Sequence, residues 1–268
     1  MHISITSILL VAAALLATFS GAGDACAARY VPISSGAFRS ALQPDGQPAL
    51  TTVMPVMMRT TLVSNAEFRE FLVTHPAWRR DLVPSVFAGG DYLSQWHDAQ
   101  SFAPLAAAAP VTQISWFAAQ AFCASEQARL PRWIEWELGA AADPQRTDAR
   151  GDPLWLAQIL SWYAAPASTP PAIIGQQTPN IYDLHDMHGL VWEWVEDFNG
   201  LLVNADSREQ GSPAQRDFCG GAALSLGDRQ NYAVLMHLAL LSAMQANQEG
   251  RYLGFRCVRD PVQPGGSP

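Results

Sequence analysis

The stretch from His185 to Asp197 holds the most unusual side chain of the sequence, a glutamate between two tryptophans. Glu193 lies there in a run that is otherwise apolar, which is typical of a buried segment. An isolated carboxylate in apolar surroundings costs several kcal/mol, so Glu193 is expected to have a strong partner.

Two kinds of partner could compensate this carboxylate. Four more acids lie nearby in the sequence: Asp183, Asp186, Glu196 and Asp197. No Lys or Arg occurs between Arg150 and Arg208, so an external cation is the simplest compensation. Oxygen ligands favour a hard divalent ion, calcium before magnesium. In the alternative, Glu193 is a core residue that pairs with a distant arginine, and the other acids lie on the surface.

The composition is that of a folded, acidic protein. The chain has 268 residues, of which 49% are hydrophobic and 15% charged, which allows a large core and excludes a disordered chain. Its net charge is −8, and all 16 basic residues are arginines. Because no segment forms a basic stripe, nucleic acid is not expected as a partner.

Residues 1–27 have the pattern of a signal peptide. An apolar run from Ile3 to Phe19 is followed by small residues and by an A-x-A cleavage motif that ends at Ala27. We therefore predict cleavage after Ala27, a periplasmic or secreted protein, and no association with the membrane after cleavage. Because no Lys or Arg precedes the apolar run, an uncleaved anchor stays open as an alternative.

Three cysteines remain after the predicted cleavage: Cys123, Cys219 and Cys257. In an oxidising compartment an odd number indicates one disulfide and one free thiol. Their positions in the sequence do not show which two are paired.

Capping signals and apolar spacing predict four helices. A capping box at Ser64 begins the first helix, which Pro76 ends. Ser115 is the expected cap of a second helix, and a third begins with Pro131 near its first turn. A shorter helix is predicted for residues 154–162.

Strands and loops are predicted for the rest of the chain. Residues 29–58 indicate short strands broken by turns, and residues 252–258 indicate one closing strand. Residues 78–110 and 166–179 indicate loops, the first one packed by its aromatic side chains. Residues 231–244 are apolar enough for a buried helix or a pair of strands. Helices and strands alternate without a βαβ rhythm, so we predict a mixed α+β domain.

Four stretches occur in the order expected for one family: Pro110–Cys123, Arg129–Glu137, Asp186–Trp194 and Leu253–Cys257. Together they resemble the formylglycine-generating enzyme, or sulfatase-modifying factor, family over roughly residues 30–260. The resemblance implies one irregular domain of this type, related to the C-type lectin fold. It would comprise residues 28–262, followed by a tail at residues 263–268.

The resemblance also implies a metal site and a disulfide. The family's calcium site falls on two side chains and two backbone carbonyls: those of Asp186 and Glu193, and of Gly189 and Val191. The family's core disulfide falls on Cys123 and Cys257. Closing a loop of this length would stabilise the fold by roughly 4–5 kcal/mol in the chain-entropy model.

The family's catalytic cysteines do not carry over to this chain. The enzymes that convert cysteine to formylglycine hold copper on two cysteines, whose positions fall here near Gln230 and Leu235. Neither residue supplies a thiolate for Cu(I), so copper-dependent oxidation is not expected. As the odd thiol, Cys219 could instead be a catalytic redox centre, a metal ligand or a mixed-disulfide partner. The alternative is a buried, inert cysteine, and whether copper binds stays open.

Three functions stay open. The first is a periplasmic maturation or accessory factor for a metalloprotein, acting through Cys219. The second is a non-catalytic, calcium-stabilised scaffold that binds a protein or peptide. The third is an oxidase of a small molecule, so whether the chain is an enzyme stays undecided. Several segments resemble an exported branch labelled NirV, which is associated with copper nitrite reductases. A copper enzyme or copper chaperone is therefore the partner that this resemblance implies.

Overall fold

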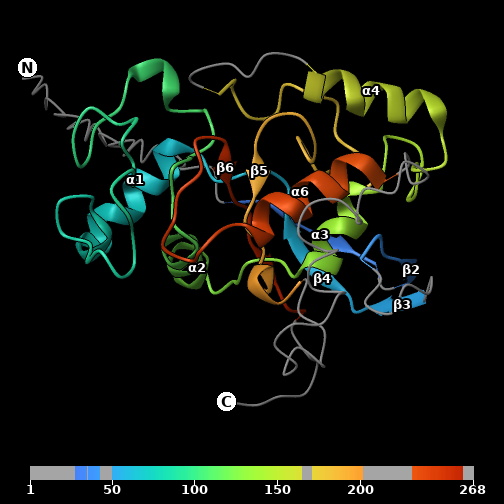
Figure 1. The fold of residues 1–268 in the computed structure, drawn as a ribbon, viewed down its shortest axis with the longest axis horizontal. Coiled ribbons are helices and arrows are strands. Elements are labelled where there is room, and N and C mark those ends of the chain that lie inside the picture. Colours follow the sequence, from blue (N-terminus) through green and yellow to red (C-terminus); the bar gives the residue numbers. More distant parts are fainter. Residues whose placement is uncertain (1–27, 35, 43–49, 165–170, 202–230, 262–268) are drawn as a thin grey trace, which may run out of the picture.

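A computed structural model describes residues 28–34, 36–42, 50–164, 171–201 and 231–261 of the chain. Within these residues, helices surround three small sheets, and long irregular segments connect the elements (Figure 1). This mixture of helices and strands confirms the predicted α+β domain.

The two ends of the domain meet in a three-stranded antiparallel sheet. Its order is β1 (Tyr30–Ile33), β4 (Val56–Arg59) and β7 (Val258–Arg259), so β4 lies in the centre. In the register, Met58 of β4 lies opposite residues of both neighbouring strands and is fully buried. The sheet therefore ties the start of the domain to its last strand.

Two further strand pairs complete the described sheets. β2 (Gly36–Arg39) and β3 (Leu50–Val53) pair in antiparallel fashion. β5 (Trp192–Glu193) and β6 (Leu253–Gly254) pair in parallel, with Glu193 opposite Gly254. Two of the four stretches that resemble the family are therefore neighbours in space.

The single closing strand predicted for residues 252–258 is wrong, because β6 and β7 are separate. Every residue from Leu253 to Val258 is buried, so the segment lacks the alternation between core and solvent of a regular half-buried strand. Arg256 lies between the two strands and turns its buried guanidinium toward β5. The interruption allows this charge to reach a partner in the interior.

The described helices follow the predictions closely. They are α1 (Asn65–Thr74), α2 (Trp116–Ser125), α3 (Trp133–Ala140), α4 (Pro153–Ala164) and α6 (Tyr232–Ser242), with short 3₁₀ helices at Pro76–Trp78, Pro104–Ala106 and Phe198–Gly200. Ser64 and Ser115 cap the first two helices as predicted. Pro131 lies two residues before α3, near its first turn as predicted, and Glu135 accepts the amide of Arg132 as part of the cap. The segment after residue 231 is a helix and not a pair of strands.

Aromatic side chains fill the core between α1, α2 and the segment after β6. Phe68 packs against Phe122 with ring centroids 5.8 Å apart, and both contact Phe255. Residues 78–110 are mainly irregular, as predicted, and Trp96 of this segment packs against Phe68. Long irregular segments are therefore held by side-chain packing.

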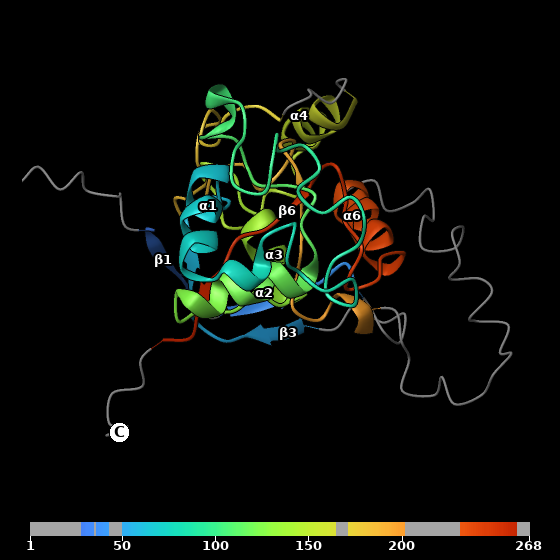
Figure 2. The same cartoon turned by 90° about the vertical axis from the view of Figure 1, so that its left-hand side faces the viewer.

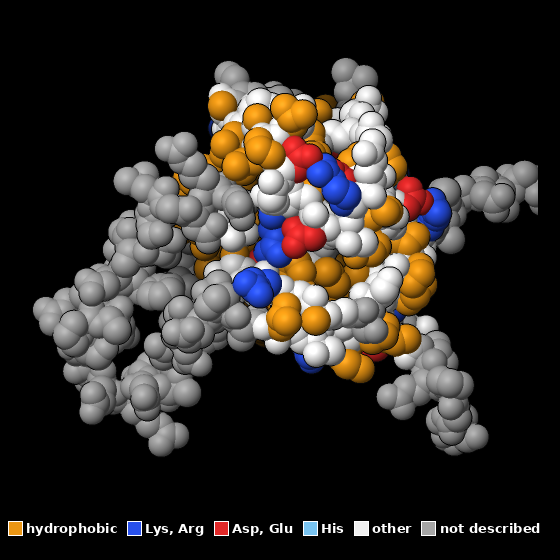
Figure 3. All heavy atoms as spheres, turned by 90° about the vertical axis from the view of Figure 1, so that its right-hand side faces the viewer, with side chains coloured by type: hydrophobic (Ala, Val, Ile, Leu, Met, Phe, Trp, Pro, Cys, Tyr) orange, Lys and Arg blue, Asp and Glu red, His pale blue; other side chains and the backbone are white. Residues whose placement is uncertain are grey.

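α4 lies at the top of the molecule in both ribbon views, and its contacts with α6 join the two helices (Figures 1 and 2). On the face in Figure 3, acidic and basic side chains lie next to one another and do not form a separate basic patch. Among the described residues, no helix has the length and apolar character needed to cross a membrane.

Candidate functional site

Glu193 of β5 has its partner within the chain. Its carboxylate accepts hydrogen bonds from Arg256, at 2.6 Å from Nε and 2.9 Å from Nη2, and both side chains are fully buried. Arg256 also donates to the carbonyl of His185 at 3.0 Å. The parallel pairing of β5 with β6 places the two residues together, because Arg256 follows β6 by two positions. Of the two kinds of partner considered for Glu193, the structure has the distant arginine.

The neighbouring acids also have partners that are distant in sequence. Asp183 lies 2.5 Å from Arg29, Glu196 lies 3.2 Å from Arg132, and Asp197 accepts the amide of Trp133 at 2.8 Å. The sequence argument for an external cation counted only nearby residues. Because the fold brings arginines and amides from elsewhere, that argument no longer applies to these acids.

The four groups of the predicted calcium site fit calcium only in part. Both oxygens of Glu193 face Arg256, and Oδ2 of Asp186 accepts the amide of Gly175 at 2.6 Å. No three His, Cys, Asp or Glu side chains in the described part of the chain group together as a metal would require. Calcium usually takes six to eight oxygen ligands. Calcium at Asp186, Glu193, Gly189 and Val191 therefore rests on the resemblance and stays a prediction.

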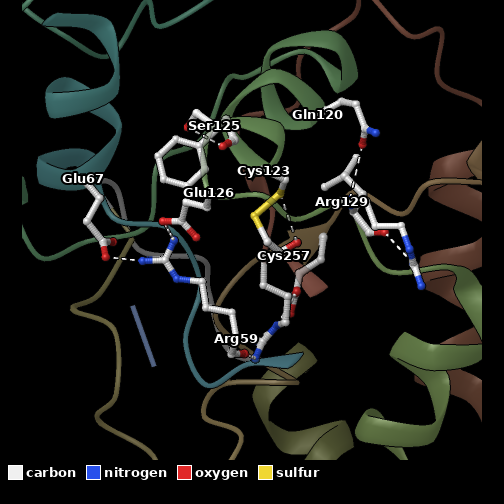
Figure 4. Close-up of a disulfide and its surroundings, with 12 residues drawn as sticks. Arg59, Glu67, Gln120, Cys123, Ser125, Glu126, Arg129 and Cys257 are labelled. Atoms are coloured by element: carbon white, nitrogen blue, oxygen red, sulfur yellow. Dashed lines mark hydrogen bonds and ion pairs between the residues drawn. A yellow bond between two sulfur atoms is a disulfide. The ribbon is translucent and has the colours of Figure 1, made fainter. Parts of the chain in front are cut away.

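The disulfide between Cys123 and Cys257 is confirmed. It joins α2 to the residue before β7, with the two Cα atoms 5.5 Å apart (Figure 4). Beside it, Arg59 is buried and forms ion pairs with Glu67 and Glu126. With this bond formed, the remaining cysteine after the predicted cleavage site is Cys219. Cys219 lies outside the described residues.

The predicted position of the second copper cysteine lies on α6. Leu235 occupies it, and its side chain is 8% exposed and belongs to the hydrophobic core. The other position, Gln230, lies outside the described residues. An apolar side chain that packs in the core offers no ligand to a metal.

His237 is a buried residue of α6 that the sequence did not single out as a structural link. Its Nε2 lies 2.7 Å from the carbonyl oxygen of Glu193, to which the neutral ring donates. Burial lowers the pKa of His237 to about 3. The ring packs against Trp136, with centroids 4.4 Å apart. His237 therefore fastens α6 to β5 in its neutral form.

His188 lies in the Asp186–Trp194 stretch, the motif that also holds Glu193. Like His237, it is buried and neutral. Its Nε2 lies 2.8 Å from the carbonyl oxygen of Ala140, and its Nδ1 lies 3.4 Å from the hydroxyl of Tyr163. Burial lowers the pKa of His188 to about 4. These contacts join the motif to α3 and α4.

A cavity of about 390 Å³ lies between α4 and the segment that leads into the motif. Trp155 and Trp162 of α4 line it, together with Gln176, Asp186 and His188. Asp186 is the one member of the predicted calcium side chains that lines this space. The cavity was not predicted from the sequence. The seven-residue spacing of the two tryptophans, which places them on one face of a helix, was the available signal.

Comparisons with known proteins identify the family. The model of the sulfatase-modifying factor enzyme 1-like domain matches residues 22–261. The chain is 29% identical to the formylglycine-generating enzyme of Streptomyces coelicolor over 175 residues, which are 59% of this chain and 55% of that protein. It is 26% identical to the enzyme of the same name from Thermomonospora curvata over 174 residues, 57% of this chain and 56% of that protein. It thus spans about half the length of these relatives.

Solved structures of similar shape have low sequence identity to this chain. The structure of CarF is 17% identical, has a TM-score of 0.47, and is matched over 87% of this chain and 98% of that one. PvdO from Pseudomonas aeruginosa is 17% identical with a TM-score of 0.46, over 87% and 94% of the two chains. The family match over residues 22–261 carries the assignment. The chain belongs to the family of sulfatase-modifying factor enzyme 1-like domains.

Proposed function

We propose that this protein is an exported accessory factor that acts by binding and not by copper-dependent oxidation of cysteine. The observation that carries the proposal is Leu235 on α6, which is buried in the core at the position expected for a copper cysteine. Cu(I) favours soft sulfur ligands, and Leu235 removes one of the two that the family uses. A family member without this ligand keeps the fold of the domain but lacks a copper ligand that the oxidase reaction needs.

The partner proposed for this factor is a periplasmic protein or peptide, with a copper enzyme or copper chaperone as the first candidate. This choice follows from the resemblance to the exported branch labelled NirV. The predicted signal peptide supports it, because it would deliver the protein to the compartment of such enzymes. Nucleic acid is not proposed as a partner, since the chain is acidic, with a net charge of −8.

An assay for formylglycine tests the proposal. The purified mature protein is loaded with Cu(I) and incubated aerobically with a cysteine peptide that the Streptomyces coelicolor enzyme converts. Mass spectrometry then measures aldehyde formation. We expect no conversion by this protein and full conversion by the Streptomyces enzyme as the positive control. Conversion that depends on added copper would overturn the proposal.

A second candidate, maturation through Cys219, is favoured by the disulfide. Because Cys123 and Cys257 are joined, Cys219 is the cysteine left for thiol chemistry after signal cleavage. Wild-type protein and the Cys219→Ser variant are compared for Cu(I) binding and for maturation of a periplasmic copper enzyme. Loss of both in the variant supports this candidate. Unchanged Cu(I) binding and unchanged maturation would rule out this candidate and leave partner binding as the proposed function.

A further inference from the structure

The cavity under α4 has aromatic walls on one side. Trp155 and Trp162 stand perpendicular to each other, at 89° with centroids 5.7 Å apart. Trp162 also packs against Gly189, where an added Cβ would lie 2.8 Å from the Trp162 side chain. This contact fixes the wall, because Gly189 has a φ of +85° and a larger residue would be both strained and crowded.

The rest of the cavity lining carries one carboxylate and several amides. Gln177 donates to the carbonyl of His188 at 3.0 Å, and Asn180 donates to the carbonyl of Gly139 at 2.8 Å. These bonds hold the wall in place. Gln176 and Thr178 complete this part of the lining.

Asp186 gives the cavity its charge. Its side chain is 4% exposed, and its Oδ2 accepts the amide of Gly175. No arginine of the described ranges lines the cavity or forms an ion pair with Asp186. A carboxylate that is enclosed and lacks a cation is a strong attractor for a positive ligand.

We infer that this cavity binds a small organic ammonium ion. The positive group lies against Asp186 and the indole rings, where ion pairing and cation–π attraction act together. A volume of about 390 Å³ suits such a ligand. Anionic ligands are repelled by Asp186, and neutral ones leave its charge uncompensated.

The inference goes beyond the proposed function and does not depend on it, because the copper assay does not involve the cavity. The ammonium group has two sources: a free compound such as choline, or a methylated lysine side chain of a protein partner. Both present the same chemistry to Asp186 and the tryptophans.

Isothermal titration with choline tests the inference. The neutral isostere 3,3-dimethylbutan-1-ol has the same shape and hydroxyl without the charge, and we expect it to bind at least about tenfold more weakly. Asp186→Asn keeps an acceptor for the amide of Gly175 and should also lose about tenfold in affinity. Glu70→Gln, which removes an exposed carboxylate from α1, is the matched control and should bind choline like wild type.

The role of Trp155 has its own variant. Trp155→Ala removes one aromatic wall, so it should weaken choline more than its neutral isostere, because cation–π attraction acts on the positive charge. A trimethyllysine peptide that binds more tightly than choline would assign the ligand to a protein partner, and the reverse order would assign it to a free compound.

Three results would overturn the inference. The first is no binding of choline, tetramethylammonium or the peptide to a protein that melts cooperatively. The second is equal binding of choline and its neutral isostere. The third is displacement of choline by calcium at equal concentrations, which would show that Asp186 holds a metal instead.

Discussion

Asp186 and Glu193 belong to one motif, are both buried, and have opposite surroundings. Glu193 lies in the paired core of β5 and β6, where Arg256 binds both oxygens and His237 holds its carbonyl. Asp186 lies at the cavity under α4, where it accepts the amide of Gly175 and forms no ion pair with an arginine of the described ranges. A buried carboxylate with a full set of partners from its own chain is a structural element. One that lacks a counter-charge beside a cavity marks a place for a ligand.

The largest expected effect comes from breaking the buried pair. Arg256→Met leaves Glu193 buried without a counter-charge, which should lower the free energy of unfolding by about 3–5 kcal/mol. Urea denaturation of the mature protein measures the loss. The double variant Glu193→Gln with Arg256→Met should recover part of it, because no isolated charge then remains. A loss below about 1 kcal/mol in the single variant would contradict the structural role of the pair.

Acid should weaken both regions through their histidines. The pKa values of His237 and His188 are lowered by burial to about 3 and about 4. The unfolded chain, with a histidine pKa of about 6.5, therefore takes up these protons first as pH falls. Stability is fully present above pH 6.5 and declines below it, by roughly 2 kcal/mol per histidine at pH 5.

Two variants distinguish how much each histidine contributes to the loss of stability in acid. His237→Phe removes the bond to the carbonyl of Glu193 and lowers stability at every pH, but it should flatten the decline between pH 7 and pH 5. His188→Phe should flatten it by a similar amount. Urea denaturation at both pH values measures the difference, and an unchanged decline in both variants would show that other groups cause it.

Asp186→Asn should have a much smaller effect on the ligand-free protein. The amide keeps an acceptor for Gly175, and no arginine of the described ranges loses a partner. We expect a change in unfolding free energy of at most about 1 kcal/mol, of either sign, in the urea assay. A loss as large as that of Arg256→Met would mean that Asp186 is compensated within the chain, and the comparison would fail.

The smallest expected effect is that of chelation. The resemblance predicts calcium at Asp186 and Glu193, but Arg256 already compensates Glu193. Calcium at this site would therefore add little stability, and we expect EDTA to change the melting temperature by less than about 2 °C. A drop of several degrees that calcium reverses and magnesium does not would support the calcium site instead.

Local signals in the sequence predicted local structure well. Ser64 and Ser115 begin helices because a capping residue acts on amides two or three positions away. The disulfide of Cys123 and Cys257 followed from the resemblance, which carries long-range information that spacing does not. The sequence did not decide whether the partner of Glu193 is an external cation or a distant arginine, because Arg256 is 63 positions away in the chain.

The cavity could not be predicted from the sequence. Its walls come from α4 and from residues 176–188, and their approach depends on the packing of Trp162 on Gly189. Trp155 and Trp162 were visible as an apolar face of a predicted helix, which is more often buried in a core than open to a ligand. Only their presence in one cavity with Asp186 distinguishes the two uses.

The most direct test of the two roles is the melting temperature of two variants, Glu193→Gln and Asp186→Asn, each measured with and without saturating choline. Our account predicts that Glu193→Gln melts far below wild type and is still stabilised by choline. Asp186→Asn should melt near wild type and gain nothing from choline. Stabilisation of Asp186→Asn by choline to the same extent as wild type, or a normal melting temperature for Glu193→Gln, would contradict it.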